Sequence, residues 1–258
     1  MKLVLLCGGQ GTRLREETEF RPKPMVMVGD RPIMWHIMKH YSKFGIHDFV
    51  ICLGYRGDMI KEYFYNYHLK TSDFTVDLCY PPKIEFHSSQ DEANWRVTLV
   101  DTGQEALTGA RLKRIERYID GETFMMTYGD GVSDVDLAAL QAYHREKGTL
   151  ATVTAVNPPA RFGELDVKDG KAIQFLEKPQ TQVGLISGGF FVLQRGIFEY
   201  LEDEDSCNFE RGPLANLASH GELAVYEHNG FWQCMDTYRD FTLLNDLWNS
   251  GQAPWRSW

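Results

Sequence analysis

Short apolar runs alternate with amphipathic segments along the first part of the chain. Residues 3–7 form a continuous apolar run bounded by glycines, which is typical of a strand buried on both faces. Apolar positions at helical spacing predict a helix over residues 32–44, a strand follows at 49–53, and a second helix is predicted at 58–67. This strand–helix–strand alternation predicts an α/β fold with a largely parallel sheet.

The same alternation returns in the later part of the chain. The further predicted elements are strands at residues 124–128, 149–156, 190–193 and 231–235 and helices at 135–147 and 238–248. Strands without helical crossovers, which predict a partly mixed sheet, lie at 76–79, 84–86 and 96–100. Asp169-Gly170 is a preferred two-residue turn and predicts a hairpin over residues 165–176. No repeat or linker divides the chain, which predicts one domain over residues 1–258.

The composition is that of an ordinary globular protein with excess negative charge. The hydrophobic fraction is 43%, the charged fraction is 24%, and the formal net charge is -9. Such a surface repels a polyanion, which argues against a nucleic-acid partner. No apolar run is long enough to span a bilayer, and the first one is too short for a signal peptide. Five widely spaced cysteines fit neither a zinc site nor a disulfide framework, so we expect a soluble cytoplasmic protein without a membrane partner.

Three glycines directly follow the first predicted strand. They lie in the segment Leu6-Cys7-Gly8-Gly9-Gln10-Gly11-Thr12-Arg13, and Lys23 follows within the run Arg21-Pro22-Lys23-Pro24-Met25. Glycine lets backbone N–H groups approach phosphate oxygens closely. A Walker A loop would need Gly-Lys-Ser/Thr where Arg13 stands, and a dinucleotide fingerprint that starts at Gly9 would need glycine or alanine at Leu14. The segment therefore predicts a phosphate-binding turn of another kind.

Two aspartates follow predicted strands. Asp130 comes directly after residues 124–128 and stands between two glycines, and Asp236 follows the strand at 231–235. Carboxylates in such places can present hard oxygen ligands to Mg²⁺. Each aspartate taken alone fits a turn former at the end of a strand equally well.

The other charged and aromatic clusters predict structural roles. A solvated helix face is expected for most of a basic cluster that consists of Arg111, Lys113, Arg114 and Arg117. His36 and His40 lie one helical turn apart, but no glutamate follows His36, so we expect exposed helix histidines rather than a metal site. A place in the core or in a subunit interface is expected for the aromatic residues Phe190, Phe191, Phe198, Tyr200 and Phe209.

The glycine segment and the lysine run together carry a family resemblance. Gly-Gly-x-Gly-Thr-Arg-Leu at residues 8–14, followed by Pro-Lys-Pro-Met at 22–25, resembles the signature of the sugar nucleotidyltransferases. Within them, a similarity to the bacterial glucose-1-phosphate cytidylyltransferases runs along the whole chain. Its further segments are residues 35–38, 100–103, 108–114, 127–132, 161–163, 177–179, 188–191 and 235–237. The resemblance implies a Rossmann-like nucleotidyltransferase fold, in which helices flank a mostly parallel mixed sheet with small β-hairpin elaborations.

The resemblance implies transfer of the cytidylyl group of CTP to α-D-glucose 1-phosphate, with CDP-glucose and pyrophosphate as products. CDP-glucose is a precursor of deoxysugars in bacterial surface polysaccharide. A sugar phosphate is already an anionic nucleophile, so this reaction needs positioning and charge neutralisation rather than a general base. Transfer to another phosphorylated acceptor and use of UTP or dTTP remain open alternatives. A non-catalytic sensor of nucleotide-sugars is disfavoured because the charged site residues are retained. Family members are commonly homo-oligomers.

The resemblance also assigns roles to residues of this chain. The implied catalytic residues are Arg13, Lys23, Asp130 and Asp236, of which the two aspartates bind Mg²⁺. Arg13 would bridge the α-phosphate and the departing pyrophosphate, and Lys23 would neutralise the α-phosphate or the sugar phosphate. The implied nucleotide-binding residues are Leu6, Cys7, Gly8, Gly9, Gly11, Thr12, Arg13, Lys23, Thr102, Gly103, Thr108, Arg111, Tyr128, Gly129 and Asp130. The implied sugar-phosphate-binding residues are Gly163, Glu177, Lys178 and Gly188.

Two parts of this assignment stay open. Arg111 can donate to the carbonyl or ring nitrogen of cytosine, or it can be a surface arginine at the start of a helix. On the sugar side the chain departs from the cytidylyltransferase pattern, because Ser187 stands where asparagine is expected and Gly212 stands where an acidic residue is expected before Pro213. These departures leave the sugar more open than the nucleotide.

Overall fold

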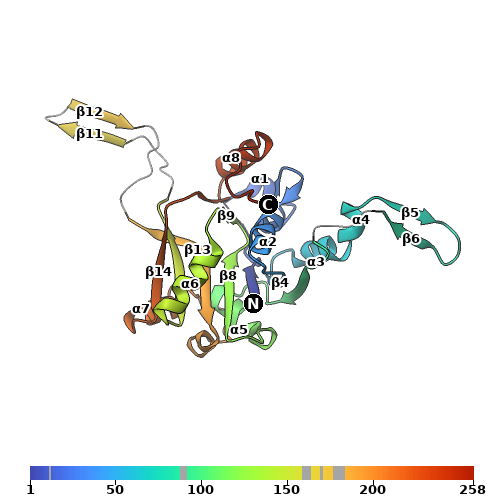
Figure 1. Cartoon of the computed structure of the whole chain (residues 1–258), viewed down its shortest axis with the longest axis horizontal. Coiled ribbons are helices and arrows are strands. Elements are labelled where there is room, and N and C mark those ends of the chain that lie inside the picture. The colour runs from blue at the N-terminus through green and yellow to red at the C-terminus, as the bar shows by residue number, and fades with distance from the viewer. Residues whose placement is uncertain (12, 88–91, 159–163, 169–170, 177–183) are drawn as a thin grey trace.

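A seven-stranded sheet forms the centre of the protein (Figure 1). The computed structural model describes residues 1–11, 13–87, 92–158, 164–168, 171–176 and 184–258. In spatial order the strands are β14 (Leu223–His228), β10 (Ala151–Val156), β13 (Ile186–Gln194), β8 (Thr123–Tyr128), β1 (Lys2–Leu6), β4 (Asp48–Leu53) and β7 (Arg96–Asp101). Strand β13 is antiparallel to both of its neighbours, and the other pairings are parallel. The predicted mostly parallel mixed sheet is confirmed.

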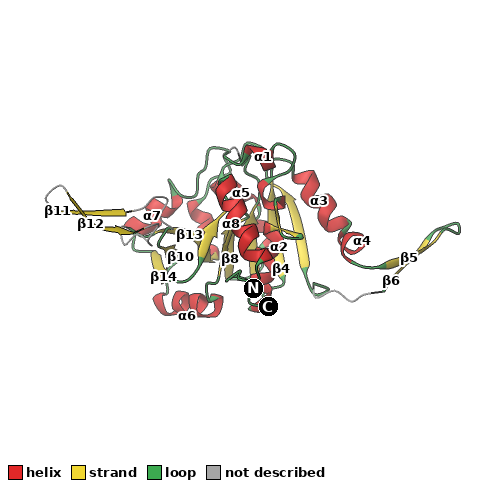
Figure 2. Ribbon diagram, turned by 90° about the horizontal axis from the view of Figure 1, so that it is seen from above, coloured by secondary structure: helices red, strands yellow, loops and turns green. Residues whose placement is uncertain are grey.

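Helices cover both faces of this sheet (Figure 2). They are α1 (Arg15–Thr18), α2 (Ile33–Lys43), α3 (Gly57–Tyr65), α4 (Tyr67–Thr71), α5 (Thr108–Arg114), α6 (Leu137–Lys147), α7 (Pro213–Ser219) and α8 (Tyr238–Asn249), with 3-10 turns η1 (Lys23–Met25), η2 (Glu116–Tyr118) and η3 (Arg195–Tyr200). Side chains of a strand alternate between its two faces. Accordingly Leu3 and Leu5 pack in the core that contains α2, whereas Val4 and Leu6 pack in the core that contains α5 and η3.

Four two-stranded pairs complete the fold. They are β2 (Met27–Val28) with β3 (Arg31–Pro32), β5 (Phe74–Asp77) with β6 (Lys83–Phe86), β9 (Gly131–Ser133) with β15 (Trp232–Cys234), and β11 (Glu164–Lys168) with β12 (Lys171–Leu176). The β5–β6 and β11–β12 hairpins project away from the central sheet (Figure 1). The hairpin predicted at 165–176 is confirmed, and its Asp169-Gly170 turn lies outside the described residues.

The pairing of β9 with β15 was not anticipated from the sequence. The strand predicted at 231–235 does not join the central sheet but pairs antiparallel with β9, where Cys234 lies opposite Gly131. The backbone N–H of Met235 also donates to the carbonyl of Asp130 at 2.8 Å. This pairing brings Asp236, from the end of the chain, next to Asp130.

The expectation that His36 and His40 are exposed on a helix is wrong. Both lie on α2 and are buried, with exposed fractions of 0% and 3%. Nε2 of His36 meets the carbonyl of Val28 at 2.9 Å, and Nε2 of His40 meets the carbonyl of Val135 at 2.9 Å. These bonds satisfy one polar edge of each ring, which allows histidine to fill an apolar interior. Most of the aromatic cluster is core as predicted, since Phe190, Phe191, Phe198 and Phe209 are buried.

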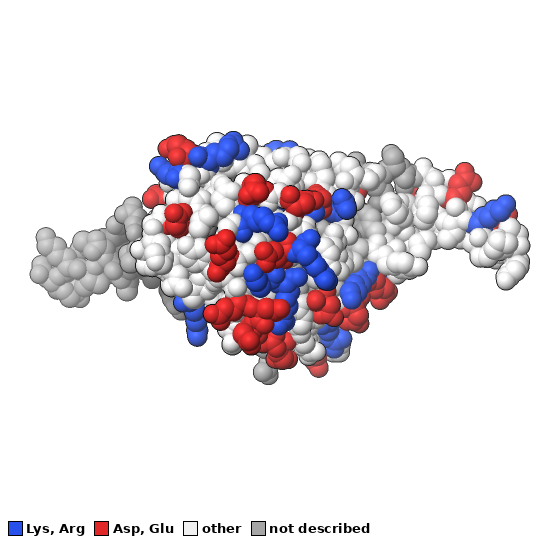
Figure 3. All heavy atoms as spheres, turned by 90° about the horizontal axis from the view of Figure 1, so that it is seen from below, with Lys and Arg blue, Asp and Glu red and all other residues white. Residues whose placement is uncertain are grey.

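The surface carries mixed charge. On the face shown in Figure 3, Lys and Arg side chains lie among Asp and Glu side chains. Among the described residues, no helix combines the length and the apolar character that crossing a membrane requires. All five cysteines are free thiols.

Candidate active site

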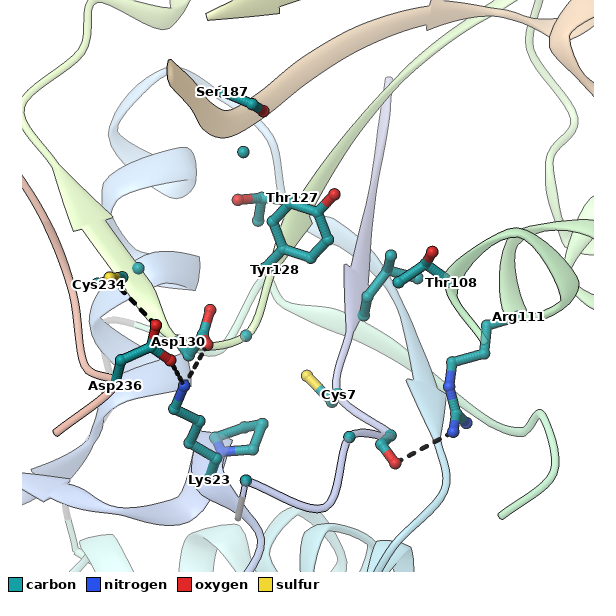
Figure 4. A pocket seen from close by; sticks show the side chains of 18 of the residues that line it. Cys7, Lys23, Thr108, Arg111, Thr127, Tyr128, Asp130, Ser187, Cys234 and Asp236 are labelled. Carbon is teal, nitrogen blue, oxygen red and sulfur yellow. Dashed lines mark hydrogen bonds and ion pairs between the residues drawn. The ribbon is translucent and has the colours of Figure 1, made fainter. Parts of the chain in front are cut away.

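A pocket of about 490 Å³ opens where the carboxyl ends of β1 and β8 meet. Because these strands are neighbours and parallel, the loops that follow them start at the same edge of the sheet. The glycine loop, residues 8–11, follows β1, and Gly129 and Asp130 follow β8. Figure 4 shows the side chain of Cys7, which directly precedes the glycine loop, and that of Asp130, from the loop after β8, at this pocket.

Glycine is required where these two loops approach each other. A side chain at Gly129 would collide with Cys7 and Pro24, and the N–H of Gly129 donates to the carbonyl of Leu6 at 3.1 Å. Gly11 has a φ of +63°, in the left-handed region that favours glycine. The sequence therefore closes the pocket floor with backbone rather than with side chains.

Four charged residues form one side of the pocket, which we call the charged wall: Arg13, Lys23, Asp130 and Asp236. Nζ of Lys23 donates to Oδ2 of Asp130 at 2.7 Å and to Oδ1 of Asp236 (Figure 4). Nη1 of Arg13 donates to Oδ2 of Asp236 at 2.9 Å. Two cations, one just after the glycine loop and one on η1, thus converge with two carboxylates that follow β8 and β15.

Neighbouring charges decide the ionisation of this wall. Burial by itself would lower the pKa of Lys23, but Asp130 and Asp236 beside it raise that pKa above its usual value. Burial by itself would raise the pKa of Asp236, but the bonds and charges of Lys23 and Arg13 hold that pKa below its usual value. Lys23 is therefore an ammonium and Asp236 a carboxylate at neutral pH.

The two aspartates fit a divalent cation that also binds phosphate. Both carboxylates already face one ammonium nitrogen, so their oxygens lie within reach of a common small cation. The described residues contain no group of three or more His, Cys, Asp or Glu side chains arranged for a metal. Mg²⁺ is usually held by one or two carboxylates together with phosphate oxygens and water. Asp130 and Asp236 match that limited donor set.

Of the two alternatives for Arg111, the surface arginine at the start of a helix is wrong. Its exposed fraction is 4%, and its guanidinium donates to the carbonyls of Leu53 at 2.9 Å, Gly103 at 2.7 Å and Gly8 at 3.1 Å. Further donations reach the carbonyl of Gln104 and the hydroxyl of Thr102. Burial lowers its pKa from the usual value. Arg111 thus ties the start of the glycine loop to the ends of β4 and β7.

Hydroxyl groups and one carboxylate form a second side, which we call the hydroxyl wall: Tyr128, Thr108 and Glu210. The Tyr128 phenol donates to Oε1 of Glu210, and the Thr108 hydroxyl donates to Oε2 of Glu210 at 2.6 Å. Burial, together with the Glu210 charge, raises the pKa of Tyr128 above its usual value. The phenol therefore keeps its proton at neutral pH.

The third side of the pocket belongs to β13 and β15. Ser187, Gly188 and Gly189 line it from β13, and Trp232 lines it from β15. Nε1 of Trp232 donates to the carbonyl of Gly188 at 2.7 Å. This bond fixes the indole beside a stretch of glycine backbone.

Most of the predicted site residues meet in this one pocket. The predicted residues that line it are Leu6, Cys7, Gly8, Gly9, Gly11, Arg13, Lys23, Thr108, Arg111, Tyr128, Gly129, Asp130, Gly188 and Asp236. Thr102 and Gly103 do not line it, but they accept hydrogen bonds from the guanidinium of Arg111, which does. Thr12, Gly163, Glu177 and Lys178 lie outside the described residues.

Sequence analysis missed several residues of the pocket. Trp232, Asn208 and Cys234 line it, and Glu210 stands at its rim. Glu210 had a signal, because it is the one acidic residue in the segment 206–213, where an acidic residue was expected at position 212. Nothing in the sequence indicated a pocket position for Trp232, because an aromatic residue in a predicted strand usually joins the core.

Comparisons with known proteins agree with this geometry. Residues 2–242 match the family model described as "Nucleotidyl transferase". Proteins named "Glucose-1-phosphate cytidylyltransferase" from Salmonella typhimurium and Salmonella typhi are each 51% identical to this chain over 259 residues, which cover 100% of both sequences. The crystal structure of HddC from Yersinia pseudotuberculosis complexed with GMP-PN superposes with a TM-score of 0.68 at 19% identity, over 96% of this chain and 99% of that one. The chain therefore belongs to the nucleotidyl transferase family.

Proposed function

We propose that this protein transfers the cytidylyl group of CTP to α-D-glucose 1-phosphate and releases pyrophosphate, with CDP-glucose as the other product. The observation that carries the proposal is the meeting of Arg13, Lys23, Asp130 and Asp236 over a glycine loop in one pocket. The identity of 51% to proteins named for this activity supports the choice of CTP and glucose 1-phosphate.

The pocket suits the attack of one phosphate on another. The sugar phosphate carries its own negative charge, so its oxygen attacks the α-phosphorus of CTP without loss of a proton, and pyrophosphate leaves along the same line. Crowding two polyanions is the main barrier, and cations lower it. The charged wall supplies them.

Arg13 and Lys23 take different parts in this proposal. Arg13 is 72% exposed at the mouth, where its planar fork can hold the α-phosphate and the leaving pyrophosphate. Lys23 is only 12% exposed and can neutralise the α-phosphate or the sugar phosphate from within the charged wall. Both side chains would exchange carboxylate partners for phosphate oxygens.

Asp130 and Asp236 would hold Mg²⁺ together with the triphosphate. A bound Mg²⁺ supplies charge neutralisation at the triphosphate and makes its α-phosphorus a better electrophile. The aspartates also keep Lys23 and Arg13 in the pocket before substrates arrive, because each cation is bonded to at least one of them.

The remaining assignments follow the same proposal. The glycine loop would bind the triphosphate, the segment from Thr102 to Arg111 and Tyr128 would meet the nucleoside, and Gly188 would meet the sugar, together with Gly163, Glu177 and Lys178. We also propose a single domain over residues 1–258, a homo-oligomer, and a cytoplasmic location, where free thiols such as these five persist.

Pyrophosphate release tests the proposal. Purified protein with Mg²⁺ is incubated with CTP, UTP, dTTP or GTP, each crossed with glucose 1-phosphate, other sugar 1-phosphates and non-sugar phosphates. We expect CTP with glucose 1-phosphate to react fastest, and no release when EDTA removes the metal. If another pair reacts faster, its nucleotide and acceptor replace CTP and glucose 1-phosphate as the assigned substrates. The acceptor is the more open of the two, because Ser187 and Gly212 depart from the family pattern on the sugar side. Absence of release with every pair overturns the reaction itself.

A further inference from the structure

Three side chains from distant segments meet at the mouth of the pocket. Tyr128 ends β8, Thr108 begins α5, and Glu210 lies between η3 and α7. Each oxygen of the Glu210 carboxylate accepts one hydroxyl, that of Tyr128 on Oε1 and that of Thr108 on Oε2. Tyr128 and Thr108 line the pocket, whereas Glu210 is exposed at its rim. The carboxylate therefore joins two pocket residues without being part of the pocket floor.

Backbone contacts hold Thr108 and Glu210 in place. The N–H of Phe209 donates to the Thr108 hydroxyl oxygen at 3.0 Å. The N–H groups of Gly109 and Ala110 donate to the carbonyl of Cys207 at 3.0 and 3.2 Å. The loop that carries Glu210 is thus bonded to the first turn of α5, which fixes Glu210 next to Thr108.

Packing holds the Tyr128 ring from the other side. A side chain at Gly189, whose φ is +79°, would collide with this ring. The ring of Phe191 lies edge-on at a centroid distance of 6.2 Å. With the ring enclosed in this way, the direction of its O–H bond depends on the acceptor at its end, which is Glu210.

The bonding pattern fixes what the two hydroxyls can offer a ligand. A hydroxyl has one proton and two lone pairs. Both protons are given to Glu210, so the oxygens of Tyr128 and Thr108 face the pocket only as acceptors. Such a wall suits ligand groups that donate hydrogen bonds, such as an amino group or a sugar hydroxyl.

We propose that Glu210 is a positioning residue for nucleotide binding, which orients the hydroxyls of Tyr128 and Thr108 so that both accept from the bound nucleotide. The inference rests on the proposed function, because it takes this pocket as the nucleotide site.

Equilibrium binding of CTP and steady-state kinetics test this role. The variants are Glu210→Gln, Glu210→Ala, Tyr128→Phe and the double variant Tyr128→Phe/Glu210→Gln. Glutamine keeps the size of the side chain but can accept from one hydroxyl only and must donate to the other. Glu204→Gln is the matched control, because Glu204 is an exposed carboxylate six residues before Glu210 in the chain.

We expect Glu210→Gln and Glu210→Ala to raise the Kd and KM for CTP about tenfold, with kcat changed less. The double variant should bind no more weakly than the weaker single variant, because both changes act on the bond between Tyr128 and Glu210, and glutamine can still accept from Thr108. Glu204→Gln should bind like the wild type. If Glu210→Ala does not fold, Glu210→Gln carries the test, with thermal unfolding as a check.

Several outcomes overturn the role of Glu210. An unchanged Kd for CTP in Glu210→Gln does so. A Kd in the double variant that rises by the product of the two single increases also does so, as does a decrease in kcat with an unchanged KM for CTP. If the wild type prefers another nucleotide, the same variants are measured with it, which separates the failure of the CTP assignment from that of Glu210. A wild type that binds no nucleotide overturns both proposals.

Discussion

The two walls of the pocket are built on different principles. The charged wall balances two cations against two carboxylates, and each member can exchange its partner for a phosphate oxygen or a metal ion. The hydroxyl wall consists of hydrogen bonds whose donors and acceptors are fixed by packing and by the backbone. The first arrangement suits a reaction in which charge moves, and the second suits recognition of a ligand that does not change. Substitutions in the two walls should therefore fail in different ways.

The charged wall should show the largest losses of turnover. Asp236→Asn keeps the shape of the side chain and removes one carboxylate from the metal pair, and Arg13→Ala removes the exposed fork. We expect each to lower kcat about a thousandfold, or about 4 kcal/mol in the barrier, with little change in the melting temperature. Steady-state pyrophosphate release measures the rates.

Asp246→Asn is the control for the loss of a carboxylate, because Asp246 is exposed on α8 away from the pocket. It should keep the wild-type rate. A rate near that of the wild type in Asp236→Asn or Arg13→Ala would remove the chemical role assigned to the charged wall.

A substitution at Arg111 tests whether one residue stabilises both the glycine loop beside the charged wall and the helix that carries the hydroxyl wall. It bonds the carbonyl of Gly8 at the start of the glycine loop, and α5, which carries it, begins with Thr108 of the hydroxyl wall. Arg111→Lys keeps the charge but loses the fork, which leaves buried carbonyls without donors. We expect a loss of about 2–3 kcal/mol in the free energy of unfolding, measured by urea titration, and a higher KM for CTP.

Arg117→Lys is the matched change, since Arg117 is an exposed member of the same basic cluster. Its free energy of unfolding should stay within about 0.5 kcal/mol of the wild type. Equal stability of the two variants would contradict the structural role of Arg111.

The two walls also differ in how far the sequence could predict them. Lys23 and Asp130 stand between prolines or glycines, and Arg13 follows the glycine loop by two residues, so local sequence patterns indicated both the loop and its charged residues. For Asp236, the predicted strand that precedes it was the only local signal. The family resemblance then joined these segments, and the β9–β15 pairing supplied the contact that no local pattern contained.

The hydroxyl wall and Arg111 depend on contacts that leave little trace in the sequence. Glu210 lies 102 positions from Thr108 and 82 from Tyr128, and no periodicity links them. Arg111 bonds mainly to backbone carbonyls, which every residue type provides, so nothing in the composition marks it as buried. The edge strand β14 was missed for a related reason, because its residues are only partly buried and its side chains include Glu227 and His228.

Low pH should destabilise helix α2, which packs next to the charged wall. His36 and His40 lie on α2, which packs against β9 next to Asp130, and burial lowers the pKa of each to about 4. The unfolded chain has histidine pKa values near about 6.5, so between these values it binds more protons than the folded protein does. The free energy of unfolding should therefore fall as pH decreases from about 6.5 to about 4, by a few kcal/mol.

Urea titration at several pH values measures this fall. Among the described residues, Nδ1 of His40 has no hydrogen-bond partner, so protonation there would bury a charge without an acceptor. His40→Gln retains a donor for the carbonyl of Val135 and removes one titrating group, which should flatten the pH dependence. An equally steep dependence in His40→Gln would assign the effect to other groups.

The smallest effect is expected for Trp232, which lines the side of the pocket formed by β13 and β15, where we propose that the sugar binds. Trp232 lies four residues before Asp236 and bonds the carbonyl of Gly188 on β13. Trp232→Phe loses this bond, worth about 1 kcal/mol, and should raise the KM for the sugar phosphate about fivefold while the KM for CTP stays near its wild-type value. Trp258→Phe, at the carboxyl terminus, is the control and should change neither value. A larger change in the KM for CTP than in that for the sugar phosphate would mean that Trp232 belongs to the nucleotide side, and the division between recognition and chemistry would have to be drawn elsewhere in the pocket.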